Sequence, residues 1–355
     1  MPWWGWAWPL SACAVLAVSF AGVAGGGALT AVQAAVLVAA VFAAVYHAEV
    51  VAHRVGGPFG TLVLAVTVIE VALIVSVMLG GGPGSEALAR DTVFAAVMII
   101  LNGLVGASPL IGGVPHREQE FQARGASSAL AVLAAMVTLS LVLPNFTTSA
   151  PGPVFTDSQL VFAGAVSLVL YGAFVFVQTV RHRDYFLPEP ALAADEETHA
   201  PPPSNAAASA SLALLLVSLA VVVGLAKALT PALDAGVAAL GAPKAVVGVV
   251  IAAVVLLPEG LAAFRAARAN RLQTSMNLAL GSALASIGLT IPAVAAVSVV
   301  LGQPLALGLG PKEEVLLALS LLVSVMTLGT GRTTVLQGIV HLVILAAFLF
   351  LAVVP

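Results

Sequence analysis

Long apolar stretches fill most of this chain, and they limit its fold more than any other feature. A helix that crosses a bilayer needs about 20 mainly apolar residues. Of the 355 residues, 61% are hydrophobic and only 8% are charged, which is more apolar side chain than a water-soluble core can bury. The sequence therefore predicts an all-α polytopic membrane protein with about 11 transmembrane helices, near residues 9–26, 29–46, 58–80, 91–112, 126–144, 158–180, 209–229, 243–264, 273–300, 313–329 and 334–354.

A hydrophilic segment, 181–208, divides these helices into two groups. Its composition is that of a linker, and we interpret its acidic run Asp195–Glu197 as a solvated stretch, with a regulatory cation sensor as the alternative. If residues 1–28 form a separate N-terminal helix, five helices remain in 29–180 and five in 209–355. Two halves with an odd number of helices insert in opposite orientations, so similarity between them would indicate an inverted repeat.

Positive charge is distributed unevenly over the predicted loops. Nine of the 13 Lys and Arg residues fall on the side of the amino terminus and four on the opposite side. Because cytoplasmic loops carry an excess of basic residues, the amino terminus and the linker are expected on the cytoplasmic side of a bacterial inner membrane. The net charge of −3 gives no support for a nucleic-acid partner, and the only cysteine, Cys13, excludes disulfides within one chain. The sequence carries no signal for an oligomeric state.

Fourteen of the 16 acidic residues fall in loops or at helix ends, and the other two, Glu70 and Glu259, lie in the interior of predicted membrane spans. An ionised carboxylate is costly in hydrocarbon, so one that persists there indicates an ion or proton site shared with neighbouring helices. Each glutamate falls in the second helix of its half. Pro258, directly before Glu259, cannot donate a backbone hydrogen bond and frees a carbonyl near the acid, which favours a cavity. A role in helix packing is the alternative.

Polar and small residues follow each glutamate in the next predicted helix. They are Asn102, Gly103, Gly106 and Ser108 in the first half and Asn277, Gly281, Ser282 and Ser286 in the second. Their recurrence in register with the glutamates indicates a repeat, and it predicts that Asn102, Asn277, Ser282 and Ser286 supply oxygen ligands. Such residues also hold membrane helices together, so helix packing is an equally open interpretation.

Two carboxylates at one site inside the membrane can perform ion exchange. They hold a divalent cation as a neutral cluster or two protons as neutral acids, whereas an empty, doubly ionised site is penalised by repulsion and by loss of hydration. If the site changes its access only when its charge is compensated, cation and protons cross the bilayer alternately. The sequence therefore predicts a secondary cation/proton antiporter whose substrates are inorganic ions and which needs no cofactor.

Three segments carry a resemblance to a known family: HAEVVAHRVGGPFGTLVLAVTVIEVALI (47–74), GLVGASPLIGGVPHREQEF (103–121) and LPEGLAAFRAARANRLQTSMNLALGSALASIGLTIP (257–292). Through them the chain resembles the cation/proton exchanger branch of the calcium/cation antiporter superfamily, close to its bacterial ChaA type. The resemblance implies one helix plus two inverted five-helix repeats, packed around two glutamates that match Glu70 and Glu259. It also implies export of Ca²⁺, Na⁺ or K⁺ in exchange for H⁺.

The chain departs from the calcium-exchanger pattern at positions that usually carry ligands. Thr67 stands at an asparagine position in the first half, and its hydroxyl joins the candidate ligands. In the second half, Leu256 stands at the matching asparagine position, Gly260 at that of a histidine and Ala285 at that of a glutamine. Because Ca²⁺ prefers about six to eight oxygen ligands, the missing side-chain oxygens keep Na⁺ and K⁺ among the candidate substrates.

Two other functional classes also place acids in a membrane. A passive cation channel can have an acidic lining, but only an antiporter lets a pH gradient drive a cation uphill. An intramembrane enzyme would need a pair of aspartates, a diphosphate–metal motif or a converging serine, histidine and acid, and the predicted spans contain none of these. We interpret His341, in the last span, as structural, and the cluster HREQEF (116–121) as either a gate or a solvated loop.

Overall fold

The protein consists almost entirely of helices. The computed structural model describes residues 1–21, 26–55, 70–71, 74–75, 85–116, 118–187 and 203–355. Its α-helices are α1 (Trp3–Phe20), α2 (Gly26–Val55), α4 (Ser85–Met98), α5 (Val105–His116), α6 (Ala123–Val137), α7 (Asp157–Phe176), α9 (Asn205–Ala239), α10 (Ala245–Arg268), α11 (Leu272–Leu301), α12 (Pro311–Leu328) and α13 (Val335–Val353). Three π-helical turns, η1 (Ile99–Leu104), η2 (Thr138–Val142) and η4 (Val177–Arg181), continue α4, α6 and α7, and two short 3-10 turns are η3 (Leu143–Phe146) and η5 (Arg183–Tyr185).

Membrane-spanning helices are recognised among the described residues by their length and composition. Eight helices of the described residues are long and apolar enough to cross a membrane. Two further helices, α1 and α12, have 18 residues each. The predicted span 58–80 lies mostly outside the described residues. The structure confirms an all-α polytopic membrane protein, and the count of about 11 helices stays a prediction.

Several helices extend beyond the predicted spans. α9 has 35 residues, against the predicted span 209–229, and α2 has 30, against 29–46. The difference arises because a hydropathy window finds only the apolar part of a helix, whereas the helix continues past that part into polar sequence. α2 also begins before residue 29, where the first repeat was predicted to start. The acidic run Asp195–Glu197 of the predicted linker lies outside the described residues.

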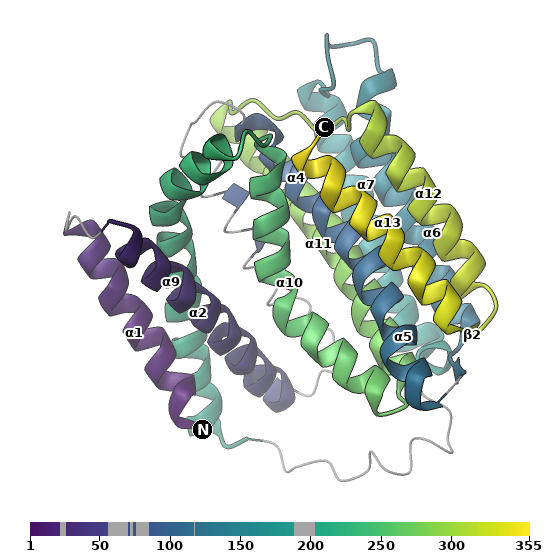
Figure 1. The fold of residues 1–355 in the computed structure, drawn as a ribbon, viewed down its shortest axis with the longest axis horizontal. Helices are drawn as coiled ribbons and strands as arrows, with labels where there is room; N and C mark the ends of the chain where they lie inside the picture. Colours follow the sequence, from purple (N-terminus) through teal and green to yellow (C-terminus); the bar gives the residue numbers. More distant parts are fainter. Residues whose placement is uncertain (22–25, 56–69, 72–73, 76–84, 117, 188–202) are drawn as a thin grey trace.

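The helices form two groups (Figure 1). In one group α1, α2 and α9 lie side by side, with α2 and α9 in extensive contact. In the other group α4, α5, α6, α7, α11, α12 and α13 pack together, and α10 joins this group through α4, α11 and α5. Because α2 belongs to the first half of the chain and α9 to the second, the first helices of the two halves are paired.

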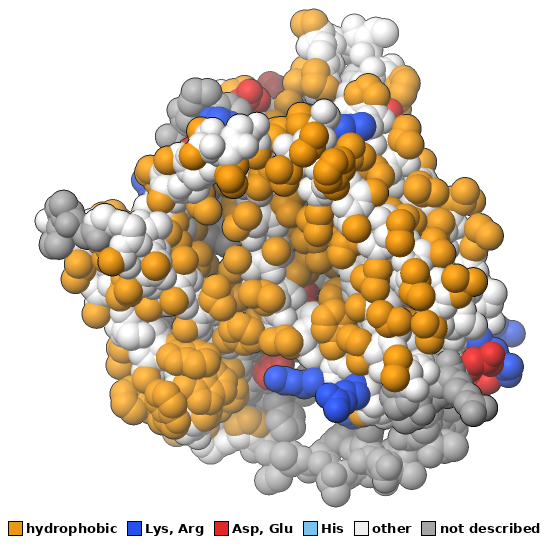
Figure 2. All heavy atoms as spheres, in the orientation of Figure 1, with side chains coloured by type: hydrophobic (Ala, Val, Ile, Leu, Met, Phe, Trp, Pro, Cys, Tyr) orange, Lys and Arg blue, Asp and Glu red, His pale blue; other side chains and the backbone are white. Residues whose placement is uncertain are grey.

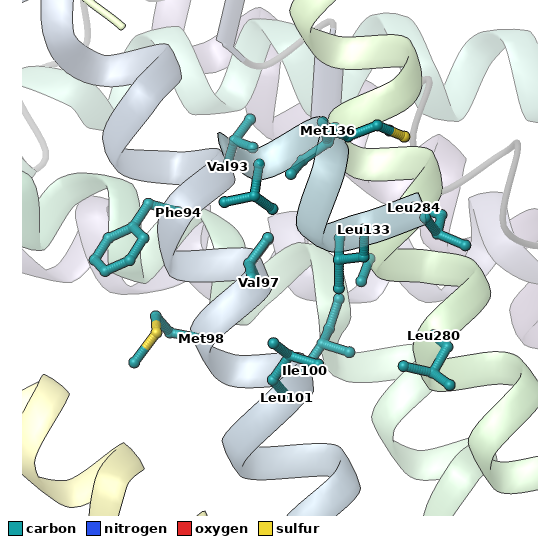
Figure 3. Packing of buried hydrophobic residues seen from close by; sticks show 14 of the residues in the cluster. Val93, Phe94, Val97, Met98, Ile100, Leu101, Leu133, Met136, Leu280 and Leu284 are labelled. Carbon is teal, nitrogen blue, oxygen red and sulfur yellow. The ribbon is translucent and has the colours of Figure 1, made fainter. Parts of the chain in front are cut away.

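The apolar core lies where α4, η1, α6 and α11 meet (Figure 3). Side chains of α4 and η1, among them Val97 and Leu101, face Leu133 of α6 and Leu284 of α11, and all four are fully buried or nearly so. Helices in lipid associate through close packing rather than through loss of water, so such complementary contacts hold the bundle together. α11, from the second half of the chain, is therefore held by neighbours from the first half.

The outer surface of the bundle is apolar. Hydrophobic side chains cover most of the face in Figure 2, while Lys and Arg side chains lie toward its ends. Exposed residues on α7 illustrate this, since Phe162, Val169 and Phe176 are all more than half exposed. An apolar belt between charged ends is the surface expected of a protein that spans a bilayer.

A short antiparallel strand pair ties the connections together at one end of the bundle. β1 (Gln119–Glu120) pairs with β2 (Arg332–Thr333), so Gln119 lies opposite Thr333. The Gln119 side chain is buried, and its Nε2 donates to the carbonyl of Ala267 and to Oδ1 of Asn270, both at 2.9 Å. The described part of the cluster HREQEF thus links the α5–α6 connection to the α12–α13 and α10–α11 connections. Gln119, which belongs to this cluster, is not solvated.

Candidate functional site

Glu70 and Glu259, one from each half of the chain, are buried inside the helix bundle. Their exposed fractions are 1% and 0%. Glu259 lies within α10, which is unbroken although it contains Pro258. Pro258 has no amide hydrogen to donate to the carbonyl of Val254, so that carbonyl lacks its usual helical partner one turn before Glu259.

Two serines of α11 hold the two glutamates. The hydroxyl of Ser282 donates to Oε2 of Glu259, and the hydroxyl of Ser286 donates to Oε2 of Glu70 at 2.6 Å. Both serines are buried. Because residues four apart lie on the same face of a helix, one face of α11 presents both hydroxyls. The structure thus brings together four of the predicted site residues.

Each of the two carboxyl groups has one engaged oxygen and one free oxygen. In the part of the chain that the structure describes, Oε1 of Glu70 and Oε1 of Glu259 are buried without a hydrogen-bond partner. A buried acceptor without a partner costs about 1–3 kcal/mol, and more when the group is charged. A proton on the carboxyl group removes its charge, and a cation beside it supplies a partner for the free oxygen, so either one lowers that cost.

The four side chains offer four carboxyl oxygens and two hydroxyl oxygens. A serine oxygen keeps its lone pairs while its proton points at a glutamate, so it can still face a cation. Two ionised carboxyl groups are neutralised by one divalent cation, by two protons, or by one monovalent cation and one proton. The arrangement is therefore suited to reversible exchange of cations for protons.

Asn102, a predicted ligand, is engaged elsewhere. It lies in the π-helical turn η1, where its Nδ2 donates to Oγ of Ser320 at 2.8 Å and its Oδ1 faces Nδ1 of His341 at 3.2 Å. The other ring nitrogen of His341 faces Oγ1 of Thr327 at 3.1 Å. The Asn102 side chain thus joins η1 to α12 and α13, and the structure does not bring it to the carboxyl pair.

Asn277, the corresponding amide of the second half, also serves to connect segments. Its Nδ2 donates to the carbonyl of Phe186, and its Oδ1 accepts from Nε2 of Gln273 at 2.8 Å. It fastens α11 to the segment that follows α7, away from Ser282. Thr67, the remaining predicted ligand, lies outside the described residues.

Two residues of α12 in this network were not among the predicted functional residues: Thr327, the partner of His341, and Ser320, the partner of Asn102. Both are buried, as is Ser324, and the spacing of the three places them on one face of α12. That spacing was the available signal, because three hydroxyls on one face of an apolar helix favour a polar contact inside the bundle.

Known proteins resemble this chain over nearly its whole length. The model of the family described as "Sodium/calcium exchanger protein" matches residues 26–180 and 210–354. The chain is 55% identical to the putative ionic transporter y4hA of Sinorhizobium fredii, over 100% of this chain and 97% of that protein. It is 34% identical to the sodium-potassium/proton antiporter ChaA of Escherichia coli, over 88% of this chain and 85% of the relative. The structure of native YfkE has the same fold, with a TM-score of 0.75 at 16% identity, covering 98% of this chain and 100% of that one.

The family match extends over both halves of the chain and leaves out the hydrophilic segment between them. It confirms the resemblance inferred from the three sequence segments, and it excludes the intramembrane enzyme that was the rival interpretation. The chain belongs to the sodium/calcium exchanger protein family, and it is a cation exchanger of the membrane.

Proposed function

We propose that this chain is a cation/proton antiporter that works by alternating access at Glu70 and Glu259. The observation that carries the proposal is that Ser282 and Ser286, on one face of α11, each donate a hydrogen bond to one of the two glutamates. One helix of the second half thereby contacts a carboxyl group from each half of the chain. Movement between the halves would change the surroundings of both carboxyl groups together.

Charge neutrality supplies the coupling. With both carboxyl groups ionised and no cation present, the buried site would hold two negative charges in a medium of low polarity, which is strongly unfavourable. The protein changes readily between its inward-facing and outward-facing conformations when protons or a cation compensate those charges. Each crossing then carries either protons or a cation, and the net result is antiport.

Ca²⁺, Na⁺ and K⁺ are the proposed substrates for export. The family description names sodium and calcium, and the Escherichia coli relative is named for sodium and potassium. Leu256, Gly260 and Ala285 offer no side-chain oxygen, so the site is near the lower end of the roughly six to eight ligands that Ca²⁺ prefers. Neutrality predicts that Ca²⁺ displaces two protons, whereas Na⁺ or K⁺ displaces one and leaves the second proton in place.

The proposed ligands are Glu70, Glu259, Ser282 and Ser286, together with Thr67. Asn102 and Asn277 are assigned instead to holding helices, because their amide groups are already hydrogen-bonded. We place the amino terminus and the segment 181–208 in the cytoplasm of a bacterial cell, on the evidence of the basic residues, and treat 29–180 and 209–355 as the two inverted repeats.

Flux measurements on the purified protein in proteoliposomes test the proposal. A fixed pH gradient is imposed, each cation is offered in turn, and the internal pH is recorded. The proposal expects cation-dependent proton movement and accumulation of the cation against its own gradient. Cation movement that only dissipates the cation gradient, without proton movement, would identify a channel and contradict the proposal.

A further inference from the structure

His341 is an ionisable side chain that the proposed exchange at the two glutamates does not use. It lies in α13, which packs beside α5 and α12 (Figure 1), and it is fully buried. Both of its ring nitrogens have partners, Asn102 on one side and Thr327 on the other. The imidazole therefore joins three segments, namely η1, α12 and α13.

The donor and acceptor of each of these hydrogen bonds can be assigned by starting at Ser320, the partner of Asn102. The hydroxyl of Ser320 donates its single proton to the carbonyl of Leu316 at 2.7 Å, so Ser320 accepts from Nδ2 of Asn102. The Oδ1 of Asn102 then faces His341 and can only accept, which makes Nδ1 of His341 the donor. The Nε2 of His341 accepts from Thr327. A neutral imidazole with its proton on Nδ1 satisfies the whole chain of bonds.

The backbones of α5 and α13 approach closely beside His341. A Cβ atom placed on Gly106 would lie 2.7 Å from Cβ of His341, and one placed on Gly338 would lie 2.6 Å from the carbonyl oxygen of Gly106. Only glycine fits at either position without a shift of the neighbouring helix. α13 is thus seated against the end of η1 by backbone contact as well as by the hydrogen bond to Asn102.

The turn that His341 holds packs directly against the turn that carries Glu259. A Cβ atom on Gly260, the residue after Glu259, would lie 3.1 Å from Cδ2 of Leu104, which belongs to η1. The wider π-helical turn sets the position of Leu104, and such turns occur often at functional sites. A shift of η1 would therefore move its contact with α10 at the glutamate.

We propose that His341, as a neutral Nδ1–H imidazole, is a positioning residue that holds η1 against the Glu259 turn and thereby sets the affinity of the site for the cation. This inference rests on the proposed exchange at the two glutamates. It assigns no proton transfer to His341, so the pH dependence of exchange belongs to the glutamates.

Two substitutions at this position separate positioning from proton transfer. His341→Asn keeps an N–H donor close to the position of Nδ1, and its amide does not titrate in the pH range of the exchange measurements. His341→Phe keeps a ring and loses both hydrogen bonds. The readouts are the apparent KM for the cation, the maximal rate, the pH profile of exchange in proteoliposomes, and thermal unfolding in detergent. Ser324→Ala is the matched control, because Ser324 is equally buried in α12 and its hydroxyl has no hydrogen-bond partner among the described residues.

The inference expects His341→Phe to raise the apparent KM about tenfold, the scale of losing the hydrogen bond to Asn102 that positions η1. Asn102→Leu should raise KM to a similar extent, and the double variant should be no worse than either single one because all three break the same contact. His341→Asn and Ser324→Ala should keep a KM within about threefold of that of the unsubstituted protein. Their pH profiles of exchange should match that of the unsubstituted protein.

Three results would overturn the inference. An unchanged KM in a folded His341→Phe variant would leave His341 with a role in stability alone. Loss of exchange or a flattened pH profile in folded His341→Asn would assign the proton to the imidazole. If His341→Phe does not fold, a KM of His341→Asn raised about tenfold or more would contradict positioning through the Nδ1 donor. Failure of the unsubstituted protein to exchange cations for protons would instead refute the proposed function itself.

Discussion

Ser286, in the second half of the chain, donates a hydrogen bond to Glu70, in the first half, over 2.6 Å. Four residues earlier on α11, Ser282 donates to Glu259. The two acids are therefore held by neighbouring turns of one helix. Acidic groups that interact strongly gain and lose protons as a pair. A change at either acid should consequently alter the behaviour of both.

Replacing either glutamate by glutamine should abolish coupled exchange while the protein still folds. Glu70→Gln and Glu259→Gln keep the volume of the side chain, but an amide cannot exchange a proton in the working range of pH. The measurement is proton flux driven by a cation gradient in proteoliposomes, with chromatographic behaviour as the check on folding. Glu86→Gln, near the start of α4, is the control and should exchange normally. Coupled exchange at the normal rate in either test variant would refute the two-glutamate mechanism.

Removing one serine hydroxyl should weaken cation affinity without uncoupling exchange. Ser282→Ala takes one neutral oxygen from the site and leaves Oε2 of Glu259 without its donor. A loss of about 1.4 kcal/mol corresponds to a tenfold rise in the apparent KM. Ser286→Ala should act similarly through Glu70. Ser298→Ala, on the same helix but bonded to the carbonyl of Gln303, should leave KM unchanged. If all three variants behave alike, the hydroxyls are not ligands.

The close contact between Gly106 and Gly338 should be intolerant of a methyl group. Gly106→Ala or Gly338→Ala would bring Cβ to within 2.7 Å of its neighbour, and overpacking of this kind costs about 1–3 kcal/mol. Thermal unfolding in detergent should show a lower midpoint for both variants. Gly172→Ala, in α7, is the matched control, since nothing lies within 4 Å of its added Cβ. Its midpoint should be unchanged or higher, because alanine favours helix.

Deleting the acidic run Asp195–Glu197 should leave the pH dependence of cation affinity intact. The run belongs to the hydrophilic segment and is interpreted as solvated, so it does not compete for the transported cation. Cation titrations at several pH values, on the intact protein and on the deletion, give the comparison. If the dependence disappears in the deletion alone, the acidic run is the sensor and the interpretation is wrong.

The apolar sequence was sufficient to predict the fold class and most helix positions. The hydrocarbon core of a bilayer requires every spanning segment to be a helix that is long enough and apolar enough to cross it. It also singled out Glu70 and Glu259, since a buried charge is rare enough in a membrane helix to indicate function. Helix ends were less predictable. α9 continues to Ala239, well past the predicted span 209–229, because a helix is not obliged to end where its apolar part does.

The roles of the polar residues could not be predicted from spacing. Ser282 and Asn277 lie five positions apart on α11, yet Ser282 contacts a glutamate and Asn277 contacts the carbonyl of Phe186. Asn102 was grouped with the ligands, but its partners are Ser320 and His341, more than 200 positions away in the sequence. Which partner an amide takes depends on helix packing between distant segments, and no local pattern records it.

The central claim is that protons and the cation compete for one pair of carboxyl groups, and cation titrations at controlled pH test it most directly. By linkage, a bound cation lowers the affinity for protons by the same factor by which protons lower the affinity for the cation. Apparent cation affinity should therefore fall as the pH is lowered from about 9 to about 6, and cation binding to the purified protein should release protons. A cation affinity that stays constant over this range, with no proton release, would contradict the account.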